Sequence, residues 1–165
     1  MRVKQPAADQ LWQLPSLGQY TVPSEWEVHN NHVNVKYYMM LYEMAGWPMV
    51  TNMGMDEAYF HERRCGLFDL EHHIRYPTEL HVGDQVSIYS RLVNRTGKRF
   101  NGLMFILNNS RNVLVSSLEF VTSGANPDTR RTAAFPDDIG ARLDSMIEEH
   151  CRLPWSAPLC GVMSA

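Results

Sequence analysis

Three polar side chains that could hold a reacting carbonyl lie close together, where a predicted strand gives way to a predicted helix. They are Asn30, His32 and Asn34. A neutral histidine can act as a base or as a hydrogen-bond donor near pH 7, and an asparagine amide can hold a carbonyl or a water molecule. The start of a helix adds unpaired backbone N–H groups and a partial positive charge, which stabilise an oxyanion. The junction is therefore a candidate site for the hydrolysis of an acyl group.

Glu43 is the carboxylate that this chemistry could use. It follows Asn34 by about two and a half helical turns, at the border of the apolar face of the predicted helix. A carboxylate at such a border can have a raised pKa and serve as a general base. The residues alone also permit a second interpretation, in which Asn34 only caps the helix, Glu43 pairs with a lysine and His32 is an ordinary loop residue.

The spacing of apolar residues predicts the elements that must position these side chains. We expect strands over 19–28, 68–76, 86–92, 103–107 and 113–123, a helix after Asn34 that Gly46 and Pro48 close, a second helical segment over 53–64, and a last helix from Pro136. Strict alternation over 68–76 predicts one buried face, and the uninterrupted apolar run 103–107 predicts a central strand covered on both sides.

One long helix followed by a run of antiparallel strands indicates an α+β fold, in which a curved sheet wraps the helix that fills its concave side. We expect one domain over 1–165, with a core at about 18–150 and a C-terminal helix and tail over 136–165. Other α+β folds share these element counts, so the pattern alone does not choose among them.

A resemblance to a known family narrows the choice. His32-Val33-Asn34 followed by Tyr38 resembles the H-[MV]-N-N-x-x-Y signature of the acyl-CoA and acyl-ACP thioesterases of the hotdog superfamily, and Glu79 with Gly83-Asp84 resembles the E-x-x-x-G-D turn of that family. The resemblance implies a hotdog fold, an antiparallel sheet of about five strands wrapped around a central helix. It also implies hydrolysis of an acyl-CoA without a cofactor. Segments 62–76 and 130–143 are most similar to betainyl-CoA thioesterases, which belong to carnitine breakdown.

The chain departs from the family pattern at two positions. Val28 stands where many members carry an aspartate four residues before the histidine, and Val35 replaces the usual second asparagine. We therefore expect Glu43 to activate the water while Asn30 and His32 hold the thioester. Alternative bases are Glu25 and Glu27, and alternative functions are a non-catalytic acyl-CoA binding protein or another hotdog enzyme such as an enoyl thioester hydratase.

Binding of the two ends of an acyl-CoA calls for different residue types. Coenzyme A phosphates need cations, and Arg91, Lys98 and Arg99 lie in or beside predicted strand ends. Aromatic faces suit a quaternary ammonium. The predicted acyl-binding residues are Trp26, Asn34, Tyr38, Tyr42 and Trp47.

Composition argues against several other classes of function. The net charge of −3, with both signs scattered, supplies no basic stripe for nucleic acid. Cys65, Cys151 and Cys160 are odd in number and contain no C-x-x-C pair, which favours reduced thiols in the cytoplasm. We expect no metal site, no membrane span, and a homodimer or tetramer, because hotdog domains generally pair across a two-fold axis.

Overall fold

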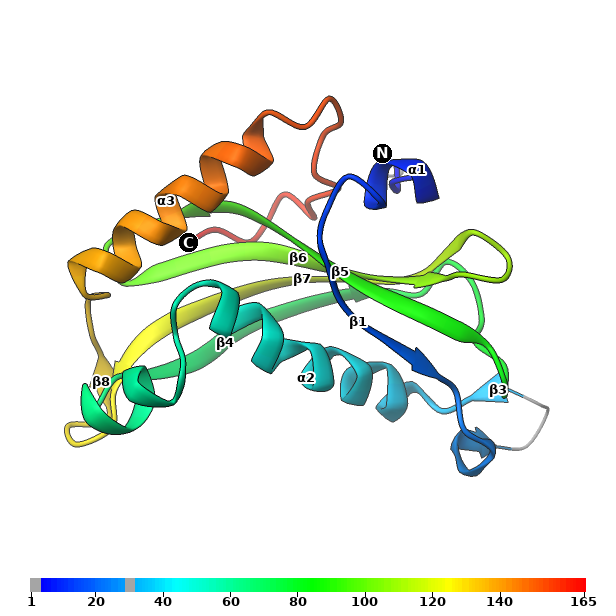
Figure 1. Cartoon of the computed structure of the whole chain (residues 1–165), viewed down its shortest axis with the longest axis horizontal. Helices are drawn as coiled ribbons and strands as arrows, with labels where there is room; N and C mark the ends of the chain where they lie inside the picture. Colours follow the sequence, from blue (N-terminus) through cyan, green and yellow to red (C-terminus); the bar gives the residue numbers. More distant parts are fainter. Residues whose placement is uncertain (1–3, 29–31) are drawn as a thin grey trace.

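The computed structural model describes residues 4–28 and 32–165, and a curved antiparallel sheet dominates it (Figure 1). The strands are β1 (Ser16–Thr21), β4 (Gly66–Arg75), β5 (Gln85–Arg95), β6 (Arg99–Asn108), β7 (Val113–Asn126) and the short β8 (Arg131–Thr132). They pair in the order β1-β5-β6-β7-β4, and β8 adds to β7. The strand β4 therefore forms one edge of the sheet.

Helix α2 (Val35–Asn52) lies along the concave side of this sheet (Figure 1). The side chain of Asn34 caps it, accepting a 3.0 Å hydrogen bond from the backbone N–H of Lys36. The face that packs on the sheet consists of Tyr38, Leu41, Tyr42, Ala45 and Met49. The expected central helix is confirmed, and its packing against the strands closes the hydrophobic core.

The expected end of this helix at Gly46 and Pro48 is wrong, because α2 continues through Pro48 to Asn52. Proline cannot donate a hydrogen bond to the carbonyl four residues earlier, which belongs to Met44. Met44 is exposed, so water can reach that turn, while burial of Met49 on the next turn holds the helix to the sheet.

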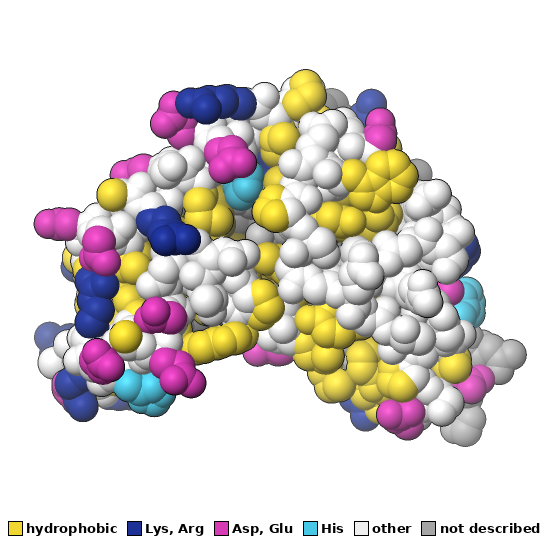
Figure 2. All heavy atoms as spheres, viewed as in Figure 1, with side chains coloured by type: hydrophobic (Ala, Val, Ile, Leu, Met, Phe, Trp, Pro, Cys, Tyr) yellow, Lys and Arg dark blue, Asp and Glu magenta, His cyan; other side chains and the backbone are white. Residues whose placement is uncertain are grey.

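The outward side of α2 is also partly apolar. Met40, Met44 and Trp47 recur at helical spacing and are all more than 40% exposed. Figure 2 shows hydrophobic side chains gathered over this region. The helix is therefore apolar on two sides, which explains why its sequence gives no sharp polar stripe.

Two short elements differ from the sequence expectation on either side of α2. The predicted strand 19–28 ends at Thr21, and Trp26 lies in a 3₁₀ turn, η1 (Ser24–Trp26), just after Pro23. Two short strands follow, β2 (Glu27–Val28) and β3 (His32–Val33), which pair with each other. The helix expected over 53–64 is reduced to a π-type turn, η2 (Ala58–Glu62).

Strand β4 contains a bulge that changes which side chains face the helix. The register against β7 shifts between Asp69 and Glu71. An extra residue reverses the alternation, so Asp69 before the bulge and His72 after it face the same way. Phe68 and Leu70 point outward and are 64% and 37% exposed. The predicted single buried face over 68–76 is therefore wrong.

The central strand β6 is covered on both faces, as its apolar run predicts. Met104 and Ile106 belong to the core under α2, whereas Leu103 and Phe105 pack in a second cluster with Trp155. The short helix α1 (Ala8–Leu11) and the C-terminal segment complete that second cluster.

The last helix, α3 (Asp137–Cys151), confirms the helix expected from Pro136 and packs on β5. None of the helices in 4–28 and 32–165 is long and apolar enough to span a membrane.

Candidate active site

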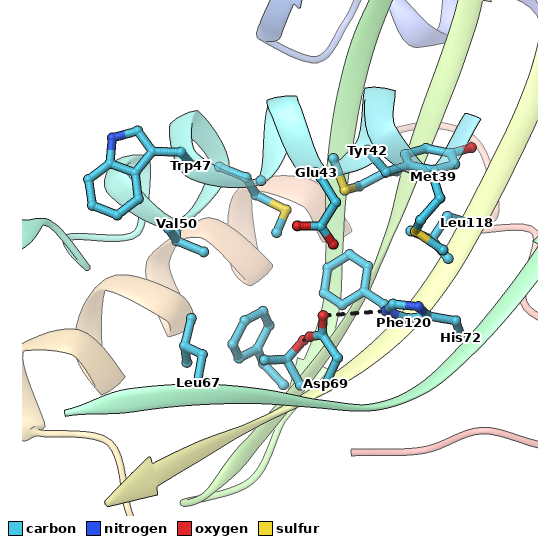
Figure 3. A pocket seen from close by; sticks show the side chains of 15 residues that line it. Met39, Tyr42, Glu43, Trp47, Val50, Leu67, Asp69, His72, Leu118 and Phe120 are labelled. Carbon is cyan, nitrogen blue, oxygen red and sulfur yellow. Dashed lines mark hydrogen bonds and ion pairs between the residues drawn. The ribbon is translucent and has the colours of Figure 1, made fainter. Parts of the chain in front are cut away.

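An open groove of about 340 Å³ separates α2 from strands β4, β6 and β7. Its walls are largely apolar, and they include Met39, Met49, Val50, Leu67, Phe100, Met104, Leu118 and Phe120. Glu43 enters it from the helix, and Asp69 and His72 enter it from β4 (Figure 3). Thr122 of β7 also lines it. The groove therefore combines an apolar lining with a compact set of acid–base groups.

Glu43 projects from α2 toward the strand side of the groove, where Asp69 and His72 lie opposite it (Figure 3). Its carboxylate has no hydrogen bond or ion pair among the side chains that the structure describes. A carboxylate without a fixed partner can accept a proton from a water molecule placed in the groove. The position at the border of the apolar helix face is the one that the sequence predicts.

Asp69 is held much more firmly than Glu43. Thr122 donates a 2.5 Å hydrogen bond to Oδ1 of Asp69, and Nε2 of His72 lies 3.5 Å from Oδ2. The interaction with His72, helped by Thr122, lowers the pKa of Asp69. The same partner carboxylate raises the pKa of His72, and the charge of Glu43 adds to this effect. Asp69 is therefore a stable anion beside a histidine that protonates readily.

Asp69 and His72 are not among the site residues that the sequence predicts. Along a regular strand, positions 69 and 72 would face opposite sides of the sheet. Only the bulge between Asp69 and Glu71 brings the two side chains into one groove. An aspartate followed three residues later by a histidine is a weak signal without knowledge of that bulge.

The predicted site residues separate into two groups in the structure. Tyr42 and Trp47 line the groove together with Glu43. Asn34 marks the beginning of α2, nine residues before Glu43, which corresponds to roughly 14 Å along the helix axis. The helix start and Glu43 therefore do not form the single compact site that the sequence suggests.

The remaining predicted residues belong to the end of the molecule where α2 begins. Trp26 stacks on Tyr37 with ring centroids 4.8 Å apart. The hydroxyl of Tyr38 accepts a 2.9 Å hydrogen bond from the backbone N–H of Leu80. His32 lies in β3, and Asn30 falls outside the described residues. Trp26 and Tyr38 thus have structural partners and do not line the groove.

Arg91 is not available for the predicted contact with coenzyme A phosphates. It is only 7% exposed, and its guanidinium donates hydrogen bonds to the carbonyls of Trp155 at 2.7 Å and His150 at 3.1 Å. The Trp155 ring lies 4.2 Å away, in a cation–π arrangement. Lys98 and Arg99 are exposed at the turn between β5 and β6, so for them the prediction stands untested.

The polar side chains of the groove do not resemble a metal centre. Across residues 4–28 and 32–165, no three His, Cys, Asp or Glu side chains converge in a way that could hold a metal ion. The polar groups that enter the groove are two carboxylates, a histidine and a hydroxyl group.

Comparison with known proteins identifies the family. The family model described as "Thioesterase-like superfamily" matches residues 22–143. A betainyl-CoA thioesterase from Pseudomonas aeruginosa is 24% identical over 132 residues, covering 79% of this chain and 82% of the relative.

Solved structures show that the curled sheet around α2 is the hotdog fold. A Staphylococcus aureus protein solved in complex with CoA superimposes with a TM-score of 0.80 at 23% identity, covering 92% of this chain and 96% of that protein. A 1,4-dihydroxy-2-naphthoyl-CoA thioesterase from Synechocystis gives a TM-score of 0.67 at 12% identity, covering 78% and 95%. With the match of the family model over 22–143, the chain belongs to the thioesterase-like superfamily, and its enzyme class is thioester hydrolysis.

Proposed function

We propose that the protein hydrolyses a small acyl-CoA in the groove beside α2, with Glu43 as the general base. The observation that carries the proposal is the Glu43 carboxylate, which enters an apolar groove without a fixed partner among the described residues. Family membership supplies the reaction class. A carboxylate that no side chain holds can bind a water molecule and remove its proton.

The reaction requires two proton movements that one carboxylate can carry out. Glu43 takes a proton from water as the water oxygen bonds to the thioester carbon. The tetrahedral oxyanion then collapses and the C–S bond breaks. The departing thiolate receives the proton from Glu43, which leaves the free acid and CoA.

Other carboxylates are less suitable for this role. Asp69 already accepts a hydrogen bond from Thr122 and has a lowered pKa, so it is a weak base. Glu25 and Glu27, the alternatives from the sequence, lie in η1 and β2 and do not line the groove. His32 lies in β3, before the start of α2, and does not line the groove that holds Glu43. Asn30 lies outside the described residues, so neither residue is given a role in the groove reaction.

The substitution Glu43→Gln tests the base assignment. We expect kcat to fall about 100-fold or more, with a small change in KM, because a positioned general base typically contributes 10²–10⁴-fold. Glu149→Gln is the matched control, since Glu149 is an exposed carboxylate on another helix, α3. Release of free thiol from a panel of short acyl-CoAs measures both. Equal rates for the two variants would remove Glu43 from the mechanism.

Betainyl-CoA is the substrate that we propose within this class. The Pseudomonas aeruginosa relative is described as a betainyl-CoA thioesterase, and the groove combines aromatic rings with two carboxylates. The trimethylammonium group of a betainyl chain is a cation without N–H donors, and aromatic faces and carboxylates suit it. The proposal therefore places the protein in carnitine breakdown.

A non-catalytic acyl-CoA binding protein is the second candidate, favoured by Val28 at the position of the usual aspartate. It predicts that acyl-CoA binds with no release of thiol at any pH. The same thiol assay distinguishes the two functions.

A homodimer in the cytoplasm completes the proposal. Strand β4 ends the sheet and exposes Phe68 and Leu70, and a second copy would cover this edge. Cys65, Cys151 and Cys160 are free thiols, which suits a reducing compartment.

A further inference from the structure

The two carboxylates of the groove, Glu43 and Asp69, have different surroundings, which suit them to different roles in the reaction. Glu43 projects from the helix without a fixed partner among the described residues, whereas Thr122 and His72 hold Asp69 on the opposite wall. Two carboxylates that share a site but differ in surroundings commonly divide the chemistry between them. One can exchange a proton, and the other stays an anion throughout the reaction.

The surroundings of Asp69 fix it as the permanent anion. Its Oδ1 accepts the Thr122 hydroxyl at 2.5 Å, so one side of the carboxylate is already occupied. The interaction with His72, together with that hydrogen bond, lowers the pKa of Asp69. Half of its side chain remains exposed toward the groove, so it can still meet a ligand. An anion of this kind attracts a cation rather than activating water.

The apolar walls around Asp69 limit which cation can approach. Phe120 lies beside Asp69 on the strand side (Figure 3). Phe100 also lines the groove, and Trp47 lines it from the helix while remaining partly exposed. A primary ammonium would need its N–H groups turned toward carboxylate oxygens or water, because the rings offer them no strong acceptor. A quaternary ammonium has no N–H group and is attracted by both aromatic faces and a carboxylate.

We infer that Asp69 is the specificity determinant of the groove and selects acyl chains that carry a quaternary ammonium next to the thioester carbonyl. The inference rests on the proposed thioesterase function and deepens it. In this arrangement the cation lies against Asp69 on the strand side, and the thioester carbon faces the water held by Glu43 on the helix side. A neutral acyl group of the same shape gains nothing from Asp69.

His72 makes the selectivity depend on pH. The groups that face it are Asp69 on its own strand and Glu43 on α2, with the Thr122 hydroxyl beside Asp69. When His72 takes up a proton, its charge offsets that of Asp69 and repels a bound cation. KM for a cationic acyl-CoA should therefore rise as the pH falls through the pKa of His72, which lies above the usual histidine value of about 6.5. KM for a neutral acyl-CoA should not follow this curve.

Two substrates of equal shape test the inference. Betainyl-CoA and 3,3-dimethylbutanoyl-CoA differ only in whether nitrogen or carbon carries the three methyl groups. We expect the wild-type protein to prefer betainyl-CoA, and Asp69→Asn to lower kcat/KM for betainyl-CoA about 10- to 100-fold more than kcat/KM for the neutral substrate. Glu71→Gln is the control, because it removes one negative charge from β4 on the other side of the bulge.

The outcomes separate this inference from the proposed function. Equal losses for both substrates in Asp69→Asn would show a structural role for Asp69 and overturn the inference, while hydrolysis itself would stand. If the wild-type protein hydrolyses neither substrate, binding affinities test the inference instead. Calorimetry then compares two inert thioethers, S-(2-trimethylammonioethyl)-CoA and S-(3,3-dimethylbutyl)-CoA. Tighter binding of the cationic thioether that Asp69→Asn abolishes would support the inference. Equal binding of the two thioethers would overturn it.

Discussion

Tyr42 donates its hydroxyl proton to Oγ of Ser116 at a distance of 2.8 Å, in the buried space between α2 and β7. Ser116 in turn donates to the backbone carbonyl of Arg75 at 3.1 Å, so the helix is tied to two strands through one hydroxyl chain. Burial raises the pKa of Tyr42 above its usual range, which keeps this hydroxyl protonated. Because Glu43 follows Tyr42 directly, the bond sets the rotation of α2 that places Glu43 at the groove.

Tyr42→Phe should therefore weaken the fold and loosen the site. Loss of one buried hydrogen bond is expected to lower the free energy of unfolding by about 1 kcal/mol. Urea denaturation measures this, and Tyr20→Phe is the control because no hydrogen bond of the Tyr20 hydroxyl is found among the described residues. A moderate fall in kcat should accompany the loss of stability. If Tyr42→Phe is as stable as the control, the hydroxyl chain does not fix the helix.

Gly102 permits a close approach that shapes the floor of the groove. A Cβ atom at this position would lie 2.9 Å from both the carbonyl oxygen of Arg91 and Cζ of Phe120. Gly102→Ala is expected to cost about 1–3 kcal/mol of stability by overpacking and to displace the Phe120 ring, which lines the groove. Gly97→Ala is the control, since a Cβ there has no neighbour within 4 Å. Thermal unfolding and kcat/KM for the two variants check the prediction, and equal behaviour would contradict it.

The sequence predicts the central elements of the fold well, because long periodic stretches dominate their packing. Helix α2 begins at the predicted cap Asn34, and β6 is buried on both faces as the run 103–107 indicates. The errors arise where a local rule meets a tertiary constraint. Pro48 should end the helix by its own chemistry, yet the burial of Met49 carries the helix further. The helix-breaking effect of one proline is local, whereas packing against the sheet stabilises the whole face of the helix.

The candidate site is predicted only in part, for a similar physical reason. Glu43 is found because its place on an apolar helix border can be read from spacing alone. Asp69 and His72 are missed because a single inserted residue in β4 reverses the alternation between them. No residue type in the segment marks the bulge. Arg91 is misplaced because the C-terminal segment that buries it is far away in the chain.

The exposed residues of β4 predict how two copies would meet. If this edge pairs with a second copy, Leu70→Glu should place a charge in the interface and shift the protein to a monomer. Sedimentation velocity at several concentrations measures the change. Val162→Glu is the control, because Val162 is an exposed apolar residue in the C-terminal segment rather than on β4. A dimer that survives Leu70→Glu would place the contact elsewhere.

His150 predicts a loss of stability in mild acid. Its Nδ1 accepts a 2.9 Å hydrogen bond from the backbone N–H of Leu92, which requires the neutral ring, and burial lowers its pKa. In the unfolded chain a histidine has a pKa of about 6.5. The unfolded state therefore binds a proton first as the pH falls below that value, so this contribution to stability is present above pH 6.5 and declines until the pH reaches the lowered pKa of the folded state.

The substitution His150→Gln should flatten this dependence, because glutamine offers an acceptor to Leu92 and does not titrate. Urea unfolding of both proteins at several values between pH 7.5 and 5.0 isolates the effect as the difference between two curves. His72 contributes with the opposite sign, since its raised pKa favours the folded state below pH 6.5 and the benefit declines as the pH rises through that pKa. It is present in both proteins, so it cancels in the difference. Parallel curves for wild type and His150→Gln would mean that His150 is not kept neutral by the contact of α3 with β5.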